Sequence, residues 1–246
     1  MKKRYIIFTA TVQLLTVTTL CAQQKTSESF WDFNYNASCG MRPDQISCGK
    51  DKAVVLGYQF NSKEKPAYAS MAVDKDKQIV LRLTNNGNDD ISNHAKTKYA
   101  HYYIPLSTES GDEAPATLDI KFRLGGKVEK KAQFAASMVF SMNSEKKSYF
   151  FWITFAKDRI FYYKKNKPAD FKYALDNTWH TARISVNLKN KTYSLHIDNK
   201  VKPIFTAQLF PTPPRAPKLQ FGDGSSSVAG SVDLAYIRMT RKYPDK

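Results

Sequence analysis

Three side chains in this sequence are of types that bind or transform sugars. Arg183 and His196 share the polar face of a predicted hairpin, "TWHTARISVNLKNKTYSLHIDNK", residues 178–200. A guanidinium binds carboxylates and an imidazole moves protons, so this pair suits an acidic sugar. Trp152, in "SYFFWITF", offers a rigid plane that can stack on the C–H face of a sugar. Two alternatives stay open, because exposed polar residues are common on strands and Trp152 could lie in a strand buried on both faces.

Further candidates lie on two other predicted strands. "HYYIPL" puts His101 and Tyr103 on one face, and "ATLDIKFRL" puts Arg123 on a polar face with Asp119 and Lys121. The aromatic strand could also be an ordinary strand, since aromatic residues favour strands in general. The candidates for carbohydrate binding are therefore Trp152, Arg183, His196, His101, Tyr103 and Arg123.

The elements that would position these residues are strands. Period-two alternation recurs from the middle of the chain onward, and helical periodicity is almost absent. The hairpin at residues 178–200 turns at residues 189–191, and "SYFFWITFAKDRIFYYKK" predicts a second hairpin that turns at Lys157 and Asp158. Further strands are predicted at "AVVLGYQF", "QIVLRLTN", "QFAASMVFSM", "LQFGDG" and "SVDLAYIRMTR", whereas the proline-rich "FPTPPRAPK" excludes a central strand.

Ten or more strands at this spacing, without a plausible interdomain linker, predict an all-β fold. We expect two antiparallel sheets packed as a jelly-roll sandwich, formed by a single domain over residues 23–246. The length of 246 residues suits one such domain. Strict alternation in the last strand would place Ala235 and Ile237 on the face of Asp233.

The first 22 residues predict a signal peptide. Lys2, Lys3 and Arg4 precede an uncharged, largely apolar run that ends at Ala22, too short to span a bilayer comfortably. The expected destination is the periplasm, the cell surface or the extracellular space. A lipoprotein acylated at Cys21 is the alternative, although the bulky Leu20 fits a lipobox poorly. No later segment predicts a transmembrane helix.

The chain is strongly basic, with a formal net charge of +16. A positive field favours anionic partners such as acidic polysaccharides, although a basic surface without a specific partner is the simpler explanation. Nucleic acid is not an expected partner, because no motif that binds DNA or RNA is recognisable. Composition does not indicate the oligomeric state.

Cysteine and acidic loops predict little ligand chemistry. Cys39 and Cys48, in "SCGMRPDQISCG", are spaced for one disulfide in an exported protein. We expect no cofactor. The loops "NNGNDD" and "GDGSSS" contain oxygen donors that suit calcium, but neither has EF-hand spacing, so turn chemistry explains them better.

Two segments resemble a known superfamily. "WHTARISVNLKNKTYSLHIDNK" resembles the hairpin of concanavalin A-like lectin/glucanase domains, including laminin-G-like modules, in which a Trp-His pair precedes an Arg-bearing strand. "LQFGDGSSSVAGSVDLAYIRM" is similar to the last strands of the same superfamily. The resemblance implies a two-sheet sandwich that hosts lectins, adhesive modules, hydrolases and lyases in different members.

The enzyme branches of the superfamily imply residues that can be checked here. Laminarinase-type hydrolases carry Glu-x-Asp-x-x-Glu on one strand, and this chain has no such cluster. A lyase needs a cation to neutralise a uronate carboxyl and a Tyr, His or Lys to move protons, and Arg183, His196, His101, Tyr103 and Arg123 supply those types. Whether the protein is an enzyme therefore stays open.

The sequence predicts an exported, lectin-like domain that binds a carbohydrate, with an acidic polysaccharide as the favoured ligand. The alternative is a polysaccharide lyase or glycoside hydrolase that acts on an anionic glycan at a non-standard site on the concave face of a sheet. A third possibility is an adhesive module that recognises protein.

Overall fold

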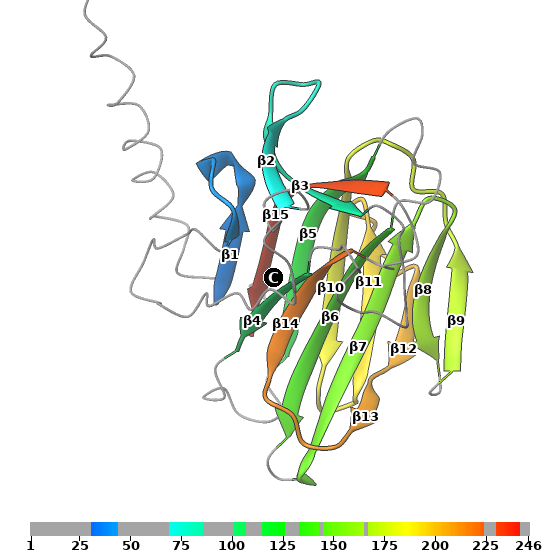
Figure 1. The fold of residues 1–246 in the computed structure, drawn as a ribbon. Helices are drawn as coiled ribbons and strands as arrows, with labels where there is room; N and C mark the ends of the chain where they lie inside the picture. Colours follow the sequence, from blue (N-terminus) through cyan, green and yellow to red (C-terminus); the bar gives the residue numbers. More distant parts are fainter. Residues whose placement is uncertain are drawn as a thin grey trace, which may run out of the picture.

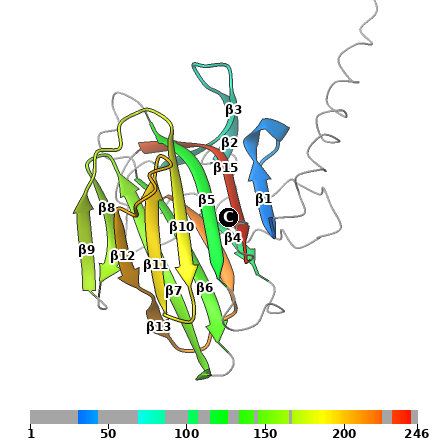
Figure 2. The ribbon, with the colours of Figure 1, turned by 180° about the vertical axis from the view of Figure 1, so that it is seen from behind.

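A computed structural model describes residues 31–43, 69–85, 101–106, 115–125, 133–142, 145–164, 167–223 and 230–241. Within these residues, fifteen strands and one short 3-10 helix, η2 (Ala37–Cys39), form two antiparallel sheets. The front sheet in Figure 1 is called sheet B, and the one nearer the viewer in Figure 2 is called sheet A. The two-sheet, all-β sandwich expected from the sequence is confirmed.

Sheet A contains the hairpin that carries Arg183 and His196. Its strands, in spatial order, are β12 (Phe205–Gln208), β11 (Thr192–Ile197), β10 (His180–Asn187), β5 (Ala116–Leu124), β15 (Gly230–Thr240), β3 (Ile79–Asn85) and β2 (Ala69–Val73), and β1 (Phe33–Asn36) also pairs with β15. In the β10–β11 hairpin, Arg183 and His196 are directly opposite each other. The prediction that these two residues share one face of the hairpin is thereby confirmed.

Sheet B contains the strand that carries Trp152. Its strands, in spatial order, are β4 (His101–Pro105), β14 (Lys218–Asp223), β6 (Gln133–Met142), β7 (Lys147–Ala156), β8 (Arg159–Lys164) and β9 (Lys167–Lys172), and the short β13 (Phe210–Thr212) pairs with β7. The β7–β8 hairpin turns at Lys157 and Asp158 as predicted. Strands β1, β2, β9, β12 and β13 were not predicted, and the predicted strand "AVVLGYQF" lies outside the described residues.

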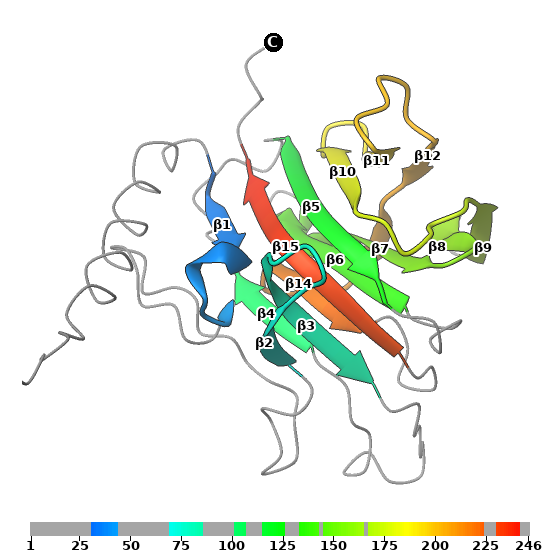
Figure 3. The same ribbon diagram turned by 90° about the horizontal axis from the view of Figure 1, so that it is seen from above.

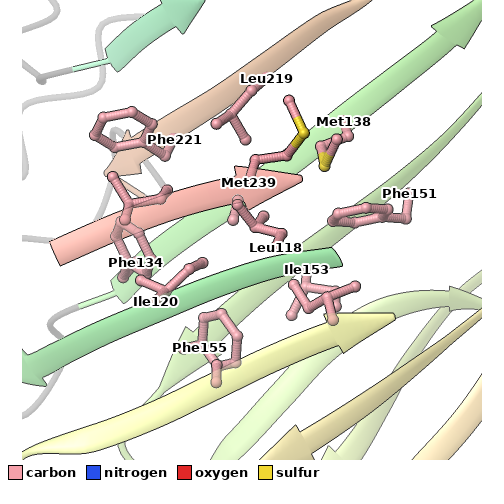
Figure 4. Packing of buried hydrophobic residues seen from close by; sticks show 14 of the residues in the cluster. Leu118, Ile120, Phe134, Met138, Phe151, Ile153, Phe155, Leu219, Phe221 and Met239 are labelled. Carbon is pink, nitrogen blue, oxygen red and sulfur yellow. The ribbon is translucent and has the colours of Figure 1, made fainter. Parts of the chain in front are cut away.

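The core lies between the two sheets, which form separate layers when seen from above (Figure 3). Leu118, Ile120 and Met239 of sheet A face Phe151 and Leu219 of sheet B (Figure 4). Each of these side chains is almost completely buried. The apolar residues alternate along their strands, because successive side chains of a strand point to opposite faces of its sheet.

The outward face of β5 departs from the expectation of a solvated polar face. Asp119 and Arg123 point away from the core, yet both are buried. The reason is a set of cross-strand ion pairs, described below, that covers them. Outward orientation therefore does not mean exposure in sheet A.

Strand β15 contains a β-bulge. Its register with β5 shifts between Leu234 and Tyr236, so Ala235 is the additional residue. Ile237 is completely buried, and Tyr236 and Arg238 lie on the outward face with Asp233. The expectation from strict alternation, that Ile237 shares the face of Asp233, is therefore wrong, because one extra residue reverses the alternation beyond it.

Candidate functional site

The outward face of sheet B has small side chains at its centre. Strand β6 presents Ala135, Ser137 and Val139 on this face, while Ala136 and Met138 point into the core. Small residues leave room between the larger side chains of the flanking strands. We call the strip formed by Ala135, Ser137 and Val139 the floor of this face, and the strands on either side of it its borders.

One row of register partners crosses this floor. The backbone pairing joins neighbouring strands in the order Tyr103 (β4), Gln220 (β14), Ser137 (β6) and Trp152 (β7). Register partners in antiparallel strands point to the same face of the sheet. We call this row, with the residues beside it on the same face, the Trp152 face.

Trp152 is held in one orientation. Its indole Nε1 donates a hydrogen bond to Oγ1 of Thr154, two residues along the same strand, at 2.9 Å. Trp152 is half-buried and Thr154 is buried. A shallow surface depression, too small to enclose a water molecule, lies beside the indole and is lined by Ala135, Ala136, Ser137, Trp152, Gln220 and Phe221.

More aromatic rings continue the Trp152 face along β7, β8 and β13. The rings of Phe150 and Phe210 have centroids 4.9 Å apart, and Tyr163 packs edge-on against Phe210 at 5.6 Å. Phe161, on β8, is 36% exposed. The face thus offers apolar ring surface on one side of the floor and polar groups on the other.

The opposite border of the floor carries a cation. Lys218 Nζ lies 4.8 Å from the ring centroid of Tyr103. Burial, followed by the positive charge of Arg215, lowers the pKa of Lys218 from its usual value. A partly desolvated cation beside an aromatic ring is suited to polar or anionic groups of a ligand.

Carboxylates are scarce on this face. Among the described strands of sheet B, only β9 and β14 contain acidic residues, Asp170 and Asp223. These two strands are separated by β6, β7 and β8. Hydrolysis with two carboxylates requires a pair close together, and the strands of the Trp152 face supply no adjacent pair.

The outward face of sheet A is organised by ions instead. Its first row, called the Asp119 row, consists of Arg183 (β10), Asp119 (β5) and Arg238 (β15), which are register partners. Arg238 donates to Oδ2 of Asp119 from Nε at 3.2 Å and from Nη2 at 2.8 Å. Arg183 Nη2 lies 3.4 Å from the same oxygen. His196 lies beside Arg183, and its Nδ1 donates to the carbonyl of Lys200.

The second row, called the Asp233 row, consists of Arg123 (β5), Asp233 (β15) and Arg82 (β3). Arg82 binds both oxygens of Asp233, at 2.7 and 3.0 Å, and Arg123 Nη2 binds Oδ2 at 2.7 Å. The guanidinium of Arg123 is also stacked on the ring of Trp179, at 4.7 Å. These contacts hold β5, β15 and β3 together and leave Arg123 buried.

The six predicted site residues do not come together. Trp152 and Tyr103 share one row on the outward face of sheet B, whereas Arg183, His196 and Arg123 lie on the outward face of sheet A, on the other side of the sandwich. The backbone of His101 pairs with Gly222 in sheet B, and its side chain is outside the described part. The candidates therefore form two separate groups.

Sequence reasoning missed several residues of the Trp152 face. These residues are Gln220 and Lys218 of β14, Ser137 of the distant β6, and Phe210 of β13, which lies in a proline-rich segment. The alternation of small outward residues in "QFAASMVFSM" was the available signal, since it marks a strand that leaves space above it. That signal does not reveal which strands lie on either side.

Several sequence predictions fall on residues that the structure does not describe. These are the signal peptide, Cys48 as the partner of Cys39, and nearly all of the two loops considered for calcium. The disulfide and export therefore remain predictions. In the described part of the chain, no helix is both long enough and apolar enough to cross a membrane.

No protein-family model matches the chain, and no curated protein does either. Among solved structures, the chain is similar to a β-1,3-glucanase from Mycobacterium marinum, with 13% identity, a TM-score of 0.47, and coverage of 85% of this chain and 98% of the glucanase. It is also similar to a sialidase, with 7% identity and a TM-score of 0.47 over 71% of this chain. A third is a botulinum neurotoxin DC binding domain in complex with SialylT, with 11% identity and a TM-score of 0.45 over 79% of this chain.

The chain spans 16% of the length of the sialidase and 49% of that of the toxin domain. The two antiparallel sheets of this chain agree with the sandwich that the resemblance to the concanavalin A-like superfamily implied.

Proposed function

We propose that the protein binds a carbohydrate on the Trp152 face, with the indole of Trp152 stacked on a sugar ring. The observation that carries this proposal is the row across sheet B, in which an oriented indole faces polar Gln220 and Tyr103 across the small side chain of Ser137. Sugar rings have apolar C–H faces and polar hydroxyl edges, and such a row complements both.

The favoured ligand is an acidic polysaccharide. Two features support this preference: the net charge of +16, which attracts polyanions, and Lys218 at the border of the floor. Export to the periplasm, the cell surface or the extracellular space would bring the protein into contact with such polymers. A single sandwich domain over residues 23–246, stabilised by a disulfide between Cys39 and Cys48, completes the proposal.

We propose that the Trp152 face binds the glycan without catalysing a reaction. The strands of the Trp152 face lack a carboxylate pair, and the residue types that a lyase would use, Arg183 and His196, lie on the opposite sheet. Chemistry that needs a cation and a proton carrier beside the stacked sugar is therefore not supported at this face.

Affinity electrophoresis in gels that contain one glycan each tests the proposal. The panel contains a polyuronate, dextran sulfate and a neutral β-glucan. We expect retention of the full chain by at least one of them, and at least about a tenfold loss of affinity in Trp152→Ala, the scale of a binding hot spot. On the neutral β-glucan, the matched control is Trp31→Ala, because Trp31 is also half-buried but contacts Arg238 on sheet A.

The same samples distinguish the enzyme alternative. Incubation with each glycan, followed by assays for new reducing ends and for the ultraviolet absorbance of unsaturated uronates, should give no product. Product formation would refute binding without catalysis. Equal retention of Trp152→Ala and the unaltered protein would refute the assignment of the site to the Trp152 face.

A further inference from the structure

The two charged rows of sheet A differ in their charge balance. In the Asp233 row, two further carboxylates approach Arg123: Asp74 Oδ2 at 3.3 Å from Nη2, and Asp76 Oδ2 at 3.6 Å from Nη1. Two guanidinium groups thus face three carboxylates. The positive charges of this row are therefore fully compensated by carboxylates.

The Asp119 row has the opposite balance. Among the described residues, Asp119 is the only carboxylate that contacts Arg183 and Arg238. Its charge is met mainly by Arg238, which makes the two shorter hydrogen bonds. Arg238 is also fixed between two rings, because its guanidinium lies 4.5 Å from the ring centroid of Trp31 and 4.5 Å from that of Tyr236.

Arg183 is the surplus cation of this row. Its contact with Asp119 is long, at 3.4 Å, and its side chain is 49% exposed, whereas the side chain of Asp119 is 1% exposed. If Arg183 turns outward, Asp119 keeps the compensation that Arg238 provides. The guanidinium can therefore exchange partners at little cost, unlike that of Arg123.

The neighbours of Arg183 suit an anionic sugar. His196 on β11 is the register partner of Arg183, and Thr181 and Ser185 flank Arg183 on the outward face of β10. Lys121 on β5 is the register partner of Thr181. Hydroxyls and cations are thus adjacent on one surface. A uronate residue also combines hydroxyls with a planar carboxylate, which a guanidinium binds through two parallel hydrogen bonds.

Asp119 supplies a further acceptor. Its Oδ1 is buried and has no hydrogen-bond donor among the residues that the structure describes, and a buried acceptor without a donor is costly. When Arg183 turns toward a carboxylate, Oδ1 becomes an acceptor for a hydroxyl of the same sugar. This gives the site a preference for a group that carries both an anion and a donor.

We propose that Arg183, with Asp119 and His196 beside it, forms a second binding site, on the outward face of sheet A, for a carboxylate-bearing sugar of a polyuronate. The site is separate from the Trp152 face, and this proposal holds whether or not the Trp152 face binds a sugar. Arg183 contacts the ligand carboxylate, and Arg238 is a positioning residue that neutralises Asp119.

The test measures polyuronate binding by the full chain and by Arg183→Gln, each with and without Trp152→Ala. The Trp152→Ala background removes any contribution of the Trp152 face, so the effect of Arg183 can be measured by itself. We expect Arg183→Gln to weaken binding about tenfold in both backgrounds, and Arg183→Lys to recover only part of the loss. The matched control is Lys189→Gln, which removes the same charge from the exposed turn that follows β10. It should weaken binding less than about twofold.

Equal losses in Arg183→Gln and Lys189→Gln would overturn the site and leave only a diffuse positive field. A greater dependence on Arg183 for dextran sulfate than for polyuronate would overturn the carboxylate assignment. Equal Arg183-dependent binding of poly-glutamate would overturn the sugar assignment. Loss of the Trp152 effect alone refutes the proposal for sheet B and leaves this one intact.

Discussion

The outward faces of the two sheets use different side chains for different ends. On sheet A, the carboxylates of Asp119 and Asp233 lie buried between arginines from neighbouring strands. On sheet B, the equivalent surface carries aromatic rings beside small residues, and the indole of Trp152 donates a hydrogen bond to Thr154 of its own strand. Buried ion pairs thus join neighbouring strands on one face, and partly exposed rings occupy the other.

The difference suggests how this sandwich separates stability from binding. A buried ion pair must keep all its partners, because removal of one leaves an uncompensated charge. A residue such as Arg123 is therefore required for stability and cannot exchange its partners for a ligand. Ring surface above a sheet that is already hydrogen-bonded contributes less to the fold, so it can change with the ligand.

The largest expected effect tests the structural role of the Asp233 row. Asp233→Asn should lower the free energy of unfolding by about 3 kcal/mol or more, because Arg82 and Arg123 lose their shared buried carboxylate. Urea unfolding measures it. The control is Asp170→Asn, whose pair with Arg159 is exposed at 3.4 Å and should contribute less than about 1 kcal/mol. Similar losses in the two variants would remove the distinction between the faces.

The next effect tests the floor of the Trp152 face. Ser137→Leu should displace the indole and weaken glycan binding about tenfold, and it should also lower the unfolding midpoint, because Ser137 is buried and a larger side chain there must push its neighbours aside. Ser185→Leu, on the outward face of sheet A, is the control and should leave binding of a neutral glucan unchanged. Unaltered binding by Ser137→Leu would show that the ligand lies elsewhere. Affinity electrophoresis gives both values.

Salt sharpens the comparison between a charged and an aromatic surface. Raising NaCl from about 0.05 M to about 0.5 M should weaken polyuronate binding several-fold and leave binding of a neutral glucan nearly constant, because ions screen exposed charges but not stacking. Titrations at fixed protein concentration follow the change. Equal salt dependence for both ligands would contradict two chemically distinct faces.

The smallest effect concerns a contact between the sheets. Lys191, in the β10–β11 turn, lies 2.7 Å from Glu145, which also accepts a hydrogen bond from Tyr149 of β7. The hydrogen bond from Lys191, then that from Tyr149, lowers the pKa of Glu145 from its ordinary value of 4.5. The stabilisation is thus present above pH 4.5 and is lost as pH falls through the lower, folded value. Glu145→Gln should slightly reduce the midpoint at pH 7 and flatten its decline in acid; an unchanged acid decline would exclude this contact as a source.

Much of the fold follows from local patterns. Alternation in β5, β6 and β10 predicted the strands and their core faces, because burial on one side of a sheet imposes period two. Strand β9 was missed because it contains Pro168, and β12 because it has only four residues; the pairing of both depends on neighbours that local sequence does not specify. The bulge at Ala235 was missed for the same reason.

The candidate site was predictable only in part. Trp152 stood out by its type, and its partner Tyr103 was found on a separate strand without evidence that the two share a row. Gln220 and Ser137 join them only through the strand order of sheet B. Arg123 had the right type and faces outward, but its burial depends on Asp74 and Asp233 from other strands.

The bulge at Ala235 makes β15 unequally sensitive to changes in chain length. Removal of this one residue would leave Leu234 and Tyr236 as consecutive residues opposite Phe122 and Lys121, so Tyr236 and Arg238 would keep the outward face and Ile237 and Met239 would keep the core. Removal of any other residue of the strand would instead shift one part of it by a residue and exchange its two faces. Within Gly230–Thr240, a deletion should therefore be tolerated best at Ala235.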